Sequence, residues 1–338
     1  MNLKELSSYL GLSQTTVSRA LNGFPEVSEK TRQRVIEAAK AHGYMPSQSA
    51  RGLATGRVGA IGHIIPLGKH QMINPHFSDF MAGVGIAYAD FGVDIVMKIC
   101  AQDQELATYR KMVKSNRVDG FVLQGPLVDD PRMDLLQTMG VPFVVHGRSA
   151  GATQPYNFLD VDNEGAFERA TQFLIDFGHR DIALLNGLET MDFAHKRRKG
   201  FLTVLQGAGI PVRPELMFSQ DMSEVYGYEV ATNILALPNP PSAMLCASKL
   251  VALGVMRAIA DAGLVAGKHV SVVTFDDDFG FLGTHAAVPQ ITCLRSSLYR
   301  AGTRVAHMMM AAVDDPLGIS TEIWEPELVV GKSTGMKL

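Results

Sequence analysis

Cysteine is scarce in this sequence of 338 residues, and it has neither long apolar runs nor a large excess of charge. Its three cysteines, Cys100, Cys246 and Cys293, have no paired spacing that would indicate a disulfide framework or a zinc site. No apolar run approaches bilayer length, and the first ten residues, MNLKELSSYL, lack the basic and apolar regions of a signal peptide. We therefore expect a cytoplasmic protein with reduced thiols and no membrane partner.

The common motifs of enzymes and metal sites are missing too. Gly56, Gly59 and Gly62 do not form the Gly-x-Gly-x-x-Gly pattern of dinucleotide binding, and the ten histidines include no HExxH spacing. The run Asp276 to Asp278 could suggest magnesium, but further oxygen ligands would have to converge from elsewhere. We expect no enzyme activity, no catalytic residue, no metal and no cofactor.

The net charge of −3 conceals an uneven distribution along the chain. Residues 1–57 contain eight basic and four acidic side chains, a formal charge of +4. The remaining 23 basic and 30 acidic side chains give −7. A basic segment on an acidic body predicts a polyanionic partner for that segment.

Residues 1–46 have the periodicity and capping signals of three helices. The first is expected to end at Gly11, the second to be capped by Ser13, and the third to follow Pro25 with Ser28 as its cap. Their predicted inner faces are Leu3, Leu6, Tyr9 and Leu10; Val17, Ala20 and Leu21; and Val35, Ile36 and Ala39. This is the arrangement of a helix-turn-helix domain.

The outward side of the second helix is expected to carry four groove-reading side chains: Gln14, Thr15, Ser18 and Arg19. Arginine can donate two hydrogen bonds to guanine, glutamine can read adenine, and threonine offers a hydroxyl and a methyl group. Ser13 and Thr16, nearer the start of the helix, are expected to reach phosphates. The alternative is a solvated polar face without a partner.

The segments QTTVSRALNG and VSEKTRQRVIEAAKAHGYMPSQSARGLATGR resemble the DNA-binding head of the lactose-repressor (LacI/GalR) family over its full length. The resemblance implies that Gln14 and Thr15 select among operators and that Arg19 reads the neighbouring base. It also adds three residues to the DNA-binding set: Asn22, Ala50 and Leu53.

Residues 47–57, SQSARGLATGR, are too short and rich in glycine to form a stable helix alone. The resemblance implies a hinge that becomes helical when two copies meet over the minor groove, with Leu53 inserted between base steps. Gly52 costs about 1 kcal/mol of helix stability relative to alanine, so this hinge depends heavily on its DNA and its partner. A flexible linker with Leu53 packed on the body is the alternative.

In the body, residues 58–338, apolar runs of strand length alternate with helical patterns in two successive sets. The alternation predicts an α/β body with two parallel sheets, each covered by helices on both faces. The family resemblance implies a two-lobed periplasmic-binding-protein fold. The expected N-lobe is approximately 58–159 plus 291–322, and the expected C-lobe approximately 160–290 plus 323–338.

Ligands of open parallel sheets bind beyond the carboxyl ends of the strands, so polar and aromatic residues there are candidate contacts. The candidates are Asn74, Phe77, His146, Arg148, Arg197, Ser248, Lys249 and Asp276. An aromatic ring with a carboxylate and a guanidinium suits a sugar, which stacks and exchanges charge-assisted hydrogen bonds. The alternative for each charged candidate is a surface or inter-lobe ion pair.

The resemblance implies an effector-binding role for Arg197, from the spacing Arg-x-x-Gly-Phe, and for Asp276, after a valine-rich strand. Ser248-Lys249 departs from the family, where aspartate usually follows, and predicts a different ligand contact there. The sequence His146-Gly147-Arg148 is similar to the pattern found in regulators of α-glucoside use.

These features together predict a transcription repressor that binds a palindromic double-stranded DNA operator as a homodimer or tetramer. A small sugar or glycoside is expected to release it from the operator. Two alternatives remain: a regulator that uses its ligand as corepressor, and a sugar-binding transport protein, which would need an export signal and no DNA-binding head.

Overall fold

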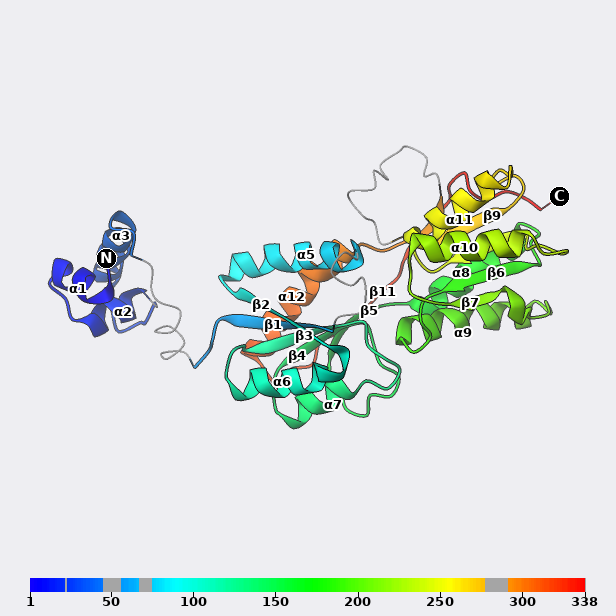
Figure 1. The fold of residues 1–338 in the computed structure, drawn as a ribbon. Helices are drawn as coiled ribbons and strands as arrows, with labels where there is room; N and C mark the ends of the chain where they lie inside the picture. Colours follow the sequence, from blue (N-terminus) through cyan, green and yellow to red (C-terminus); the bar gives the residue numbers. More distant parts are fainter. Residues whose placement is uncertain (22, 45–55, 67–74, 277–290, 338) are drawn as a thin grey trace.

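The structure, a computed structural model, describes residues 1–21, 23–44, 56–66, 75–276 and 291–337, and only the backbone of Asp276. A small helical head stands apart from a larger body made of two sheets with helices on their faces (Figure 1). Three of the predicted DNA-contacting residues, Asn22, Ala50 and Leu53, lie outside the described residues.

The head consists of three helices: α1 (Leu3–Leu10), α2 (Gln14–Leu21) and α3 (Glu29–Ala41). Each predicted boundary signal is confirmed. Gly11 ends α1 in the left-handed conformation at φ 65°. The hydroxyl of Ser13 accepts from the backbone N–H of Thr16, and that of Ser28 from the backbone N–H of Thr31.

The core of the head forms where the three helices meet. Leu6, Val17 and Val35, one from each helix, are fully buried. Two residues predicted on inner faces are exposed, Tyr9 to 63% and Ile36 to 40%. Neighbouring residues of an α-helix are turned by about 100°, so burial of Val35 directs Ile36 outward. The core of the head is therefore formed by one narrow stripe of residues from each helix.

The N-terminal lobe contains a six-stranded sheet in the order β11-β5-β4-β3-β1-β2, with parallel pairing between all neighbours. Helices α5 and α12 pack on one face, and α6 and α7 on the other. The bounds are β1 Ala60–Pro66, α5 Pro75–Phe91, β2 Asp94–Cys100, α6 Glu105–Lys114, β3 Gly120–Gln124, α7 Pro131–Thr138, β4 Phe143–His146, β5 Asn157–Val161, α12 Leu298–Asp314 and β11 Thr321–Trp324.

The C-terminal lobe repeats this plan with the strand order β12-β10-β9-β8-β6-β7. Only its β10–β12 pair is antiparallel among the pairs in the described residues. Helices α10 and α11 pack on one face, and α8 and α9 on the other. The bounds are α8 Asn163–Asp176, β6 Ile182–Asn186, α9 Asp192–Gly207, β7 Met217–Ser219, α10 Glu224–Leu235, β8 Ala243–Cys246, α11 Lys249–Asp261, β9 Ser271–Asp276, β10 Thr292–Arg295 and β12 Glu327–Val329. The predicted fold class, a helical head and two parallel-sheet lobes, is confirmed.

Strand pairing moves the expected lobe boundaries by a few residues. β10 pairs with β9 in the C-terminal sheet, whereas residues from 291 onward were expected in the N-lobe. β5 extends to Val161 and β11 to Trp324, both in the N-terminal sheet and both beyond the expected limits. The chain therefore crosses between lobes at residue 162, at residues 296–297 and at residues 325–326.

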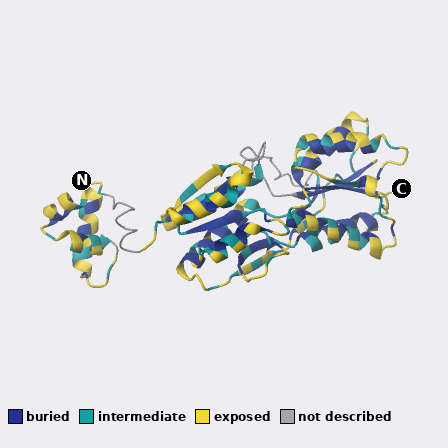
Figure 2. Cartoon of the chain, turned by 60° about the horizontal axis from the view of Figure 1, so that its bottom comes forward, coloured by how far each residue is buried: buried dark blue, intermediate teal, exposed yellow. Residues whose placement is uncertain are grey.

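Buried residues follow the sheets and the inner sides of the helices, while the outer helix faces are exposed (Figure 2). The fully buried aromatic residues Phe80, Phe121 and Phe167 lie in three separate core clusters of the body. In the part of the chain that the structure describes, no helix is both long and apolar enough to cross a bilayer.

Candidate DNA interface and ligand cavity

Helix α2 presents a polar surface that is positioned by the packing of its opposite side. Val17 and Ala20 are buried in the core of the head, while Gln14, Thr15 and Arg19 are exposed. The same helical turn thus fixes the helix and directs these three side chains outward. The arrangement is chemically suited to contact with the base edges of a major groove.

The first turn of α2 is less open. Ser13 Oγ lies 2.8 Å from Thr16 Oγ1 and 3.0 Å from the backbone nitrogen of Thr16, so both side chains stabilise the helix start. Thr16 and Ser18 are half-buried, whereas Ser13 is exposed. Ser13 is the best placed of these three to meet a phosphate.

Two arginines of α3 have structural contacts. Arg34 donates to the backbone oxygen of Leu10 at 2.8 Å, and Arg32 donates to that of Phe24 at 3.0 Å. These bonds hold the segments that flank α2 against α3. Part of the positive charge of the head therefore positions the polar surface of α2.

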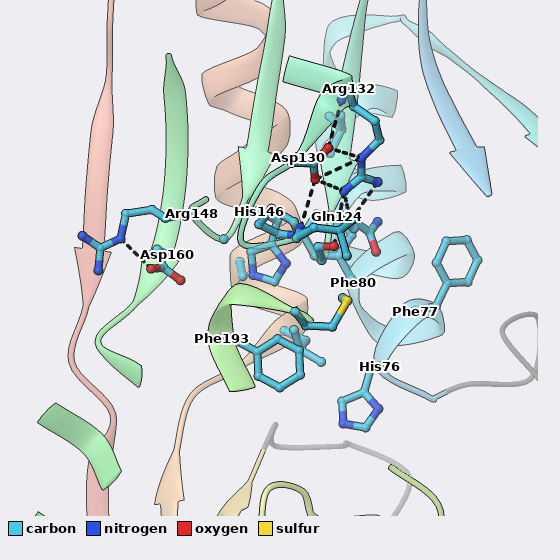
Figure 3. Close-up of a pocket in the computed structure, with 18 of the residues that line it drawn as sticks. His76, Phe77, Phe80, Gln124, Asp130, Arg132, His146, Arg148, Asp160 and Phe193 are labelled. Carbon is cyan, nitrogen blue, oxygen red and sulfur yellow. Dashed lines mark hydrogen bonds and ion pairs between the residues drawn. The ribbon is translucent and has the colours of Figure 1, made fainter. Parts of the chain in front are cut away.

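A cavity of about 690 Å³ lies between the two lobes of the body. The structure brings four of the predicted effector residues to its wall: Phe77, His146, Arg148 and Arg197. Figure 3 shows these side chains around the cavity with His76 and Phe193; His76 and Phe77 lie on α5, and Arg148 follows β4, which ends at His146. Among the described residues, the wall is thus mainly apolar, with four phenylalanine rings and seven aspartate, glutamate or arginine side chains.

Arg197 on α9 is buried, and two oxygen atoms and several aromatic rings contact its guanidinium. Its Nε donates to Asn163 Oδ1 at 2.8 Å and its Nη1 to the backbone oxygen of Ala247 at 2.6 Å. The guanidinium lies 4.0 Å from the ring centroid of Phe275 and 4.9 Å from that of Phe193. These cation–π contacts and hydrogen bonds help to hold the guanidinium at the cavity wall.

Arg148 belongs to an ion-pair cluster that joins the lobes. Its Nε donates at 2.6 Å to Asp160 on β5, and Asp160 also pairs with Lys196 of α9 at 3.4 Å. Lys196 pairs in turn with Asp192, which accepts from the backbone nitrogen of Ala150 at 3.0 Å. Arg148 thus lines the cavity and belongs to the cluster that joins the lobes, while its own ion pair, with Asp160, lies within the N-terminal lobe.

A second charged cluster on the wall was not predicted. Arg132 of α7 holds the two carboxylate oxygens of Asp130 through Nε at 2.9 Å and Nη2 at 2.6 Å. Its Nη1 lies 3.2 Å from Glu105, and its Nη2 donates to the backbone oxygen of Gln124 at 3.3 Å. Figure 3 shows this network beside Gln124. The guanidinium fastens α7 to the end of β3.

The two carboxylates of this cluster shift in opposite directions. Burial raises the pKa of Asp130, but hydrogen bonds from Arg132 and its charge outweigh burial and hold the pKa below its usual range. Burial raises the pKa of Glu105, and the more distant charge of Arg132 does not fully compensate. Asp130 is therefore the firmly ionised partner of Arg132.

His146 packs against an aromatic residue that sequence reasoning missed. Its ring stacks on that of Phe80, with centroids 4.7 Å apart and planes at 27°. Phe80 lies one helical turn beyond Phe77 on α5, so both rings reach the same side of the helix. That spacing, Phe-x-x-Phe directly after a predicted strand and loop, was the available signal.

Ser248 and Lys249 do not line this cavity. Ser248 caps α11 by accepting from the backbone nitrogen of Val251, and Lys249 is 6% exposed at the start of that helix. The preceding residue, Ala247, is the one that reaches the wall. Asn74 and the side chain of Asp276 lie outside what the structure describes, although the backbone of Asp276 ends β9 beside Arg295.

Comparison with known proteins places both parts of the chain in one family. Residues 2–47 match the model of bacterial regulatory proteins of the LacI family. Residues 59–323, more than half of the chain, match the model of periplasmic binding proteins and the sugar-binding domain of the LacI family. The chain belongs to the LacI family. The expected resemblance is therefore confirmed, and so is the prediction that the protein is a regulator and no enzyme.

Several individual LacI-family proteins are similar over most of their length. The HTH-type transcriptional regulator AglR of Rhizobium meliloti (strain 1021) is 40% identical, over 99% of this chain and 94% of its own. The HTH-type transcriptional regulator RafR of Escherichia coli is 33% identical, over 82% of each chain.

Solved structures of the LacI family superpose on the head and the body together. The lac repressor dimer bound to operator and the anti-inducer ONPF has a TM-score of 0.82 at 25% identity, over 99% of each chain. The CelR–cellobiose complex has a TM-score of 0.72 at 27% identity, over 98% of this chain and 99% of that chain.

Proposed function

We propose that this LacI-type regulator is a homodimeric transcription repressor that a small sugar or glycoside releases from a palindromic operator. The observation that carries the proposal is the presence in one chain of an exposed groove-reading surface on α2 and an aromatic, arginine-containing cavity between two lobes. Neither a transport protein nor an enzyme needs the first of these. Its place of action would be the cytoplasm, where the DNA is.

On the DNA, Gln14, Thr15, Ser18 and Arg19 would meet base edges, and Ser13 and Thr16 the backbone. Two copies related by a two-fold axis would require an operator with the same symmetry. Leu53, with Ala50 beside it in the hinge, would open a central base step in the minor groove. The lac repressor structure named above is a dimer on its operator, which supports this arrangement for a chain of the same fold.

In the cavity, Arg197 is the proposed anchor for sugar hydroxyls, and Phe77 and Phe193 the proposed stacking surfaces. A disaccharide is a suitable size class for a cavity of about 690 Å³. The relatives support a sugar, because one solved relative is a complex with cellobiose. Asp276, Asn74 and Lys249 stay candidate contacts, the last of them through movement of the start of α11.

The sugar would lower DNA affinity by favouring a lobe arrangement in which the two hinges cannot pair. By linkage, operator DNA must weaken sugar binding by the same factor. The corepressor alternative has the opposite sign and is separated by the same measurement.

The test uses the full-length protein and duplexes selected from a random library by their affinity for it. Fluorescence anisotropy should give a dissociation constant that rises at least ten-fold when maltose, sucrose, trehalose or melibiose is added. A fall on addition of sugar would establish corepression instead. Absence of any sequence preference in the selected duplexes would overturn the repressor proposal.

Arg19→Ala tests the assignment of the reading surface. Loss of a base contact is worth about 1–3 kcal/mol, so specific affinity should fall about 10- to 100-fold and selectivity at one operator position should relax. The matched control is Lys4→Ala, which removes a basic side chain from α1 of the same head. It should lower DNA affinity uniformly across sequences, if at all. Unchanged preference in Arg19→Ala would show that this side chain reads no base.

A further inference from the structure

His63 is an ionisable side chain in the middle of β1, inside the core of the N-terminal lobe. It is 2% exposed and lies on the sheet face that packs against α5 and α12, as does Ile61 two residues before it. The role proposed above for the cavity makes no use of it.

Three polar atoms in this part of the core have no hydrogen-bond partner among the described residues. They are Nδ1 and Nε2 of His63 and the hydroxyl oxygen of Tyr88. The two rings are near each other, with centroids 6.3 Å apart and planes at 65°. Buried polar groups in native proteins are almost always satisfied, so a cluster of three calls for a group that supplies the bonds.

The cavity between the lobes reaches His63. Its wall includes His63 together with Phe80, Val122 and Ala301, which are all buried residues of the N-terminal core. The part of the cavity that these four residues line, here called the arm, therefore borders the core between the sheet and helices α5 and α12. Of the four side chains, three are apolar and the imidazole of His63 is polar.

We propose that His63 is a specificity-determining residue of the effector cavity, where it exchanges a hydrogen bond with one hydroxyl of the bound sugar. This inference rests on the proposed function and names the part of the ligand that enters the arm. A hydroxyl on a narrow carbon substituent, such as a hydroxymethyl group, fits an apolar arm that ends in an imidazole.

The chemistry of the arm favours a neutral hydroxyl over a charged group. Burial lowers the pKa of His63 to about 4, so the ring is neutral near pH 7 and offers one donor and one acceptor. A hydroxyl can both donate and accept and therefore matches either ring nitrogen. A phosphate or carboxylate would lose its hydration in the arm without meeting a cation.

The deciding experiment compares wild-type protein with His63→Leu by isothermal titration calorimetry with maltose, sucrose, trehalose and melibiose. The sugar that binds the wild type most tightly should bind the variant about ten-fold more weakly or worse. Thermal unfolding without sugar should show an equal or higher Tm for the variant, because leucine removes unsatisfied polar atoms. His307→Leu, an exposed histidine of the same lobe, is the matched control and should leave both quantities unchanged.

Monodeoxy analogues of that sugar provide the ligand-side measurement. One analogue should lose affinity for the wild type and lose nothing further on His63→Leu, since the same bond is removed twice. If every deoxy analogue shows additive losses, or if wild type and His63→Leu bind the sugar equally, the assignment of His63 is wrong while the sugar-responsive function stands. If no sugar binds the wild type, the sugar class of the effector fails and the assignment fails with it. Should His63→Leu not fold, His63→Gln in the same analogue series decides the question.

Discussion

At the scale of single residues, several charged side chains of the cavity wall lie in buried or half-buried networks that fix their direction. An amide oxygen and a backbone oxygen accept hydrogen bonds from Arg197. The carboxylate of Asp130 and the backbone oxygens of Gln124 and Gly125, at the end of β3, accept from Arg132. A buried guanidinium held in this way cannot turn from the cavity without losing several charge-assisted bonds. Binding specificity can therefore depend on individual arginines.

Arg197→Lys should show how much the affinity for the sugar depends on the fixed orientation of the guanidinium. Lysine keeps the charge but cannot make both bonds or stack on Phe275, so affinity for the preferred disaccharide should fall about 10- to 100-fold, as expected from one or two charged hydrogen bonds of about 1.5–3 kcal/mol. Calorimetric titration measures it. Arg198→Lys, its half-exposed neighbour paired with Glu189, should bind as wild type does. Wild-type affinity in Arg197→Lys would remove Arg197 from the binding site.

His63 should make stability depend on pH in a particular window. Its pKa is about 4 in the folded protein and about 6.5 when exposed, so the unfolded state holds more protons between these values. Stability must then rise from pH 4 to pH 6.5 and be lost on acidification. Urea unfolding at pH 7 and pH 5 measures the free energy of unfolding of the wild type and of His63→Leu. On going from pH 7 to pH 5, the wild type should lose about 2 kcal/mol relative to His63→Leu. A difference that stays constant with pH would mean that His63 titrates alike in both states.

At the scale of elements, α5 and α12 form a close pair that carries part of the cavity wall. A Cβ atom on Gly83 of α5 would lie 2.0 Å from the backbone oxygen of Tyr299 on α12, and one on Gly302 of α12 would lie 2.1 Å from that of Phe80. The two helices approach this closely because both positions lack a side chain. The position of Phe80 and of the arm that ends at His63 follows from this contact.

Gly83→Ala should therefore separate the two helices. We expect the free energy of unfolding to fall by about 1–3 kcal/mol or more, as in other overpacked cores, with a loss of sugar affinity. Gly85→Ala on the same helix is the control, because open space surrounds its Cβ position and alanine should raise helix stability by about 1 kcal/mol. Denaturant unfolding measures the free energy of unfolding of both variants. Equal changes in Gly83→Ala and Gly85→Ala would contradict the role of close packing.

Most elements could be predicted from the sequence, because long runs such as GFVLQ and VSVVTFD have clear strand periodicity. The strands β5, β10, β11 and β12 were not assigned, since they lie beside the crossings between the lobes and their pairing within each sheet defines them. The crossing points were nonetheless predicted to within a few residues.

The site was predicted less completely than the fold. Arg148 and Arg197 follow strands or occur in a family motif, so the rule of inspecting strand ends found them. His63 lies in mid-strand, and Arg132 and Glu105 lie on helices, where the same rule does not look. Their place at the cavity arises from its depth and from side-chain reach, which one-dimensional patterns do not encode.

At the scale of the whole molecule, one helix connects the cavity with the start of the body. The first turn of α12 and Ala301 line the cavity. At its other end, Arg57 donates to the backbone oxygen of Val313 at 3.1 Å and pairs with Asp314. Arg57 is the last residue of the expected hinge, so a movement of α12 would reach the hinge directly.

Arg57→Ala should weaken this coupling. We expect sugar affinity without DNA to stay the same, because Arg57 does not line the cavity, while the ratio of operator affinities without and with sugar shrinks several-fold. Arg304→Ala, on the same helix, breaks an ion pair with Glu322 of β11; it is the control and should keep the wild-type ratio. Anisotropy titrations with and without maltose or the preferred sugar measure the ratio. An unchanged ratio in Arg57→Ala would show that α12 is not the route.

The three crossings between the lobes limit what a ligand can communicate. Each joins an element of one lobe to an element of the other through only one or two residues, at 162, 296–297 and 325–326. Three tethers this short oppose sliding and separation of the lobes, so rotation of one lobe against the other is the motion that they oppose least. The effect of any sugar that enters the cavity can then be described by one quantity, the angle between the two lobes. Ligands of different shape can then differ only in the angle they set and in how firmly they hold it.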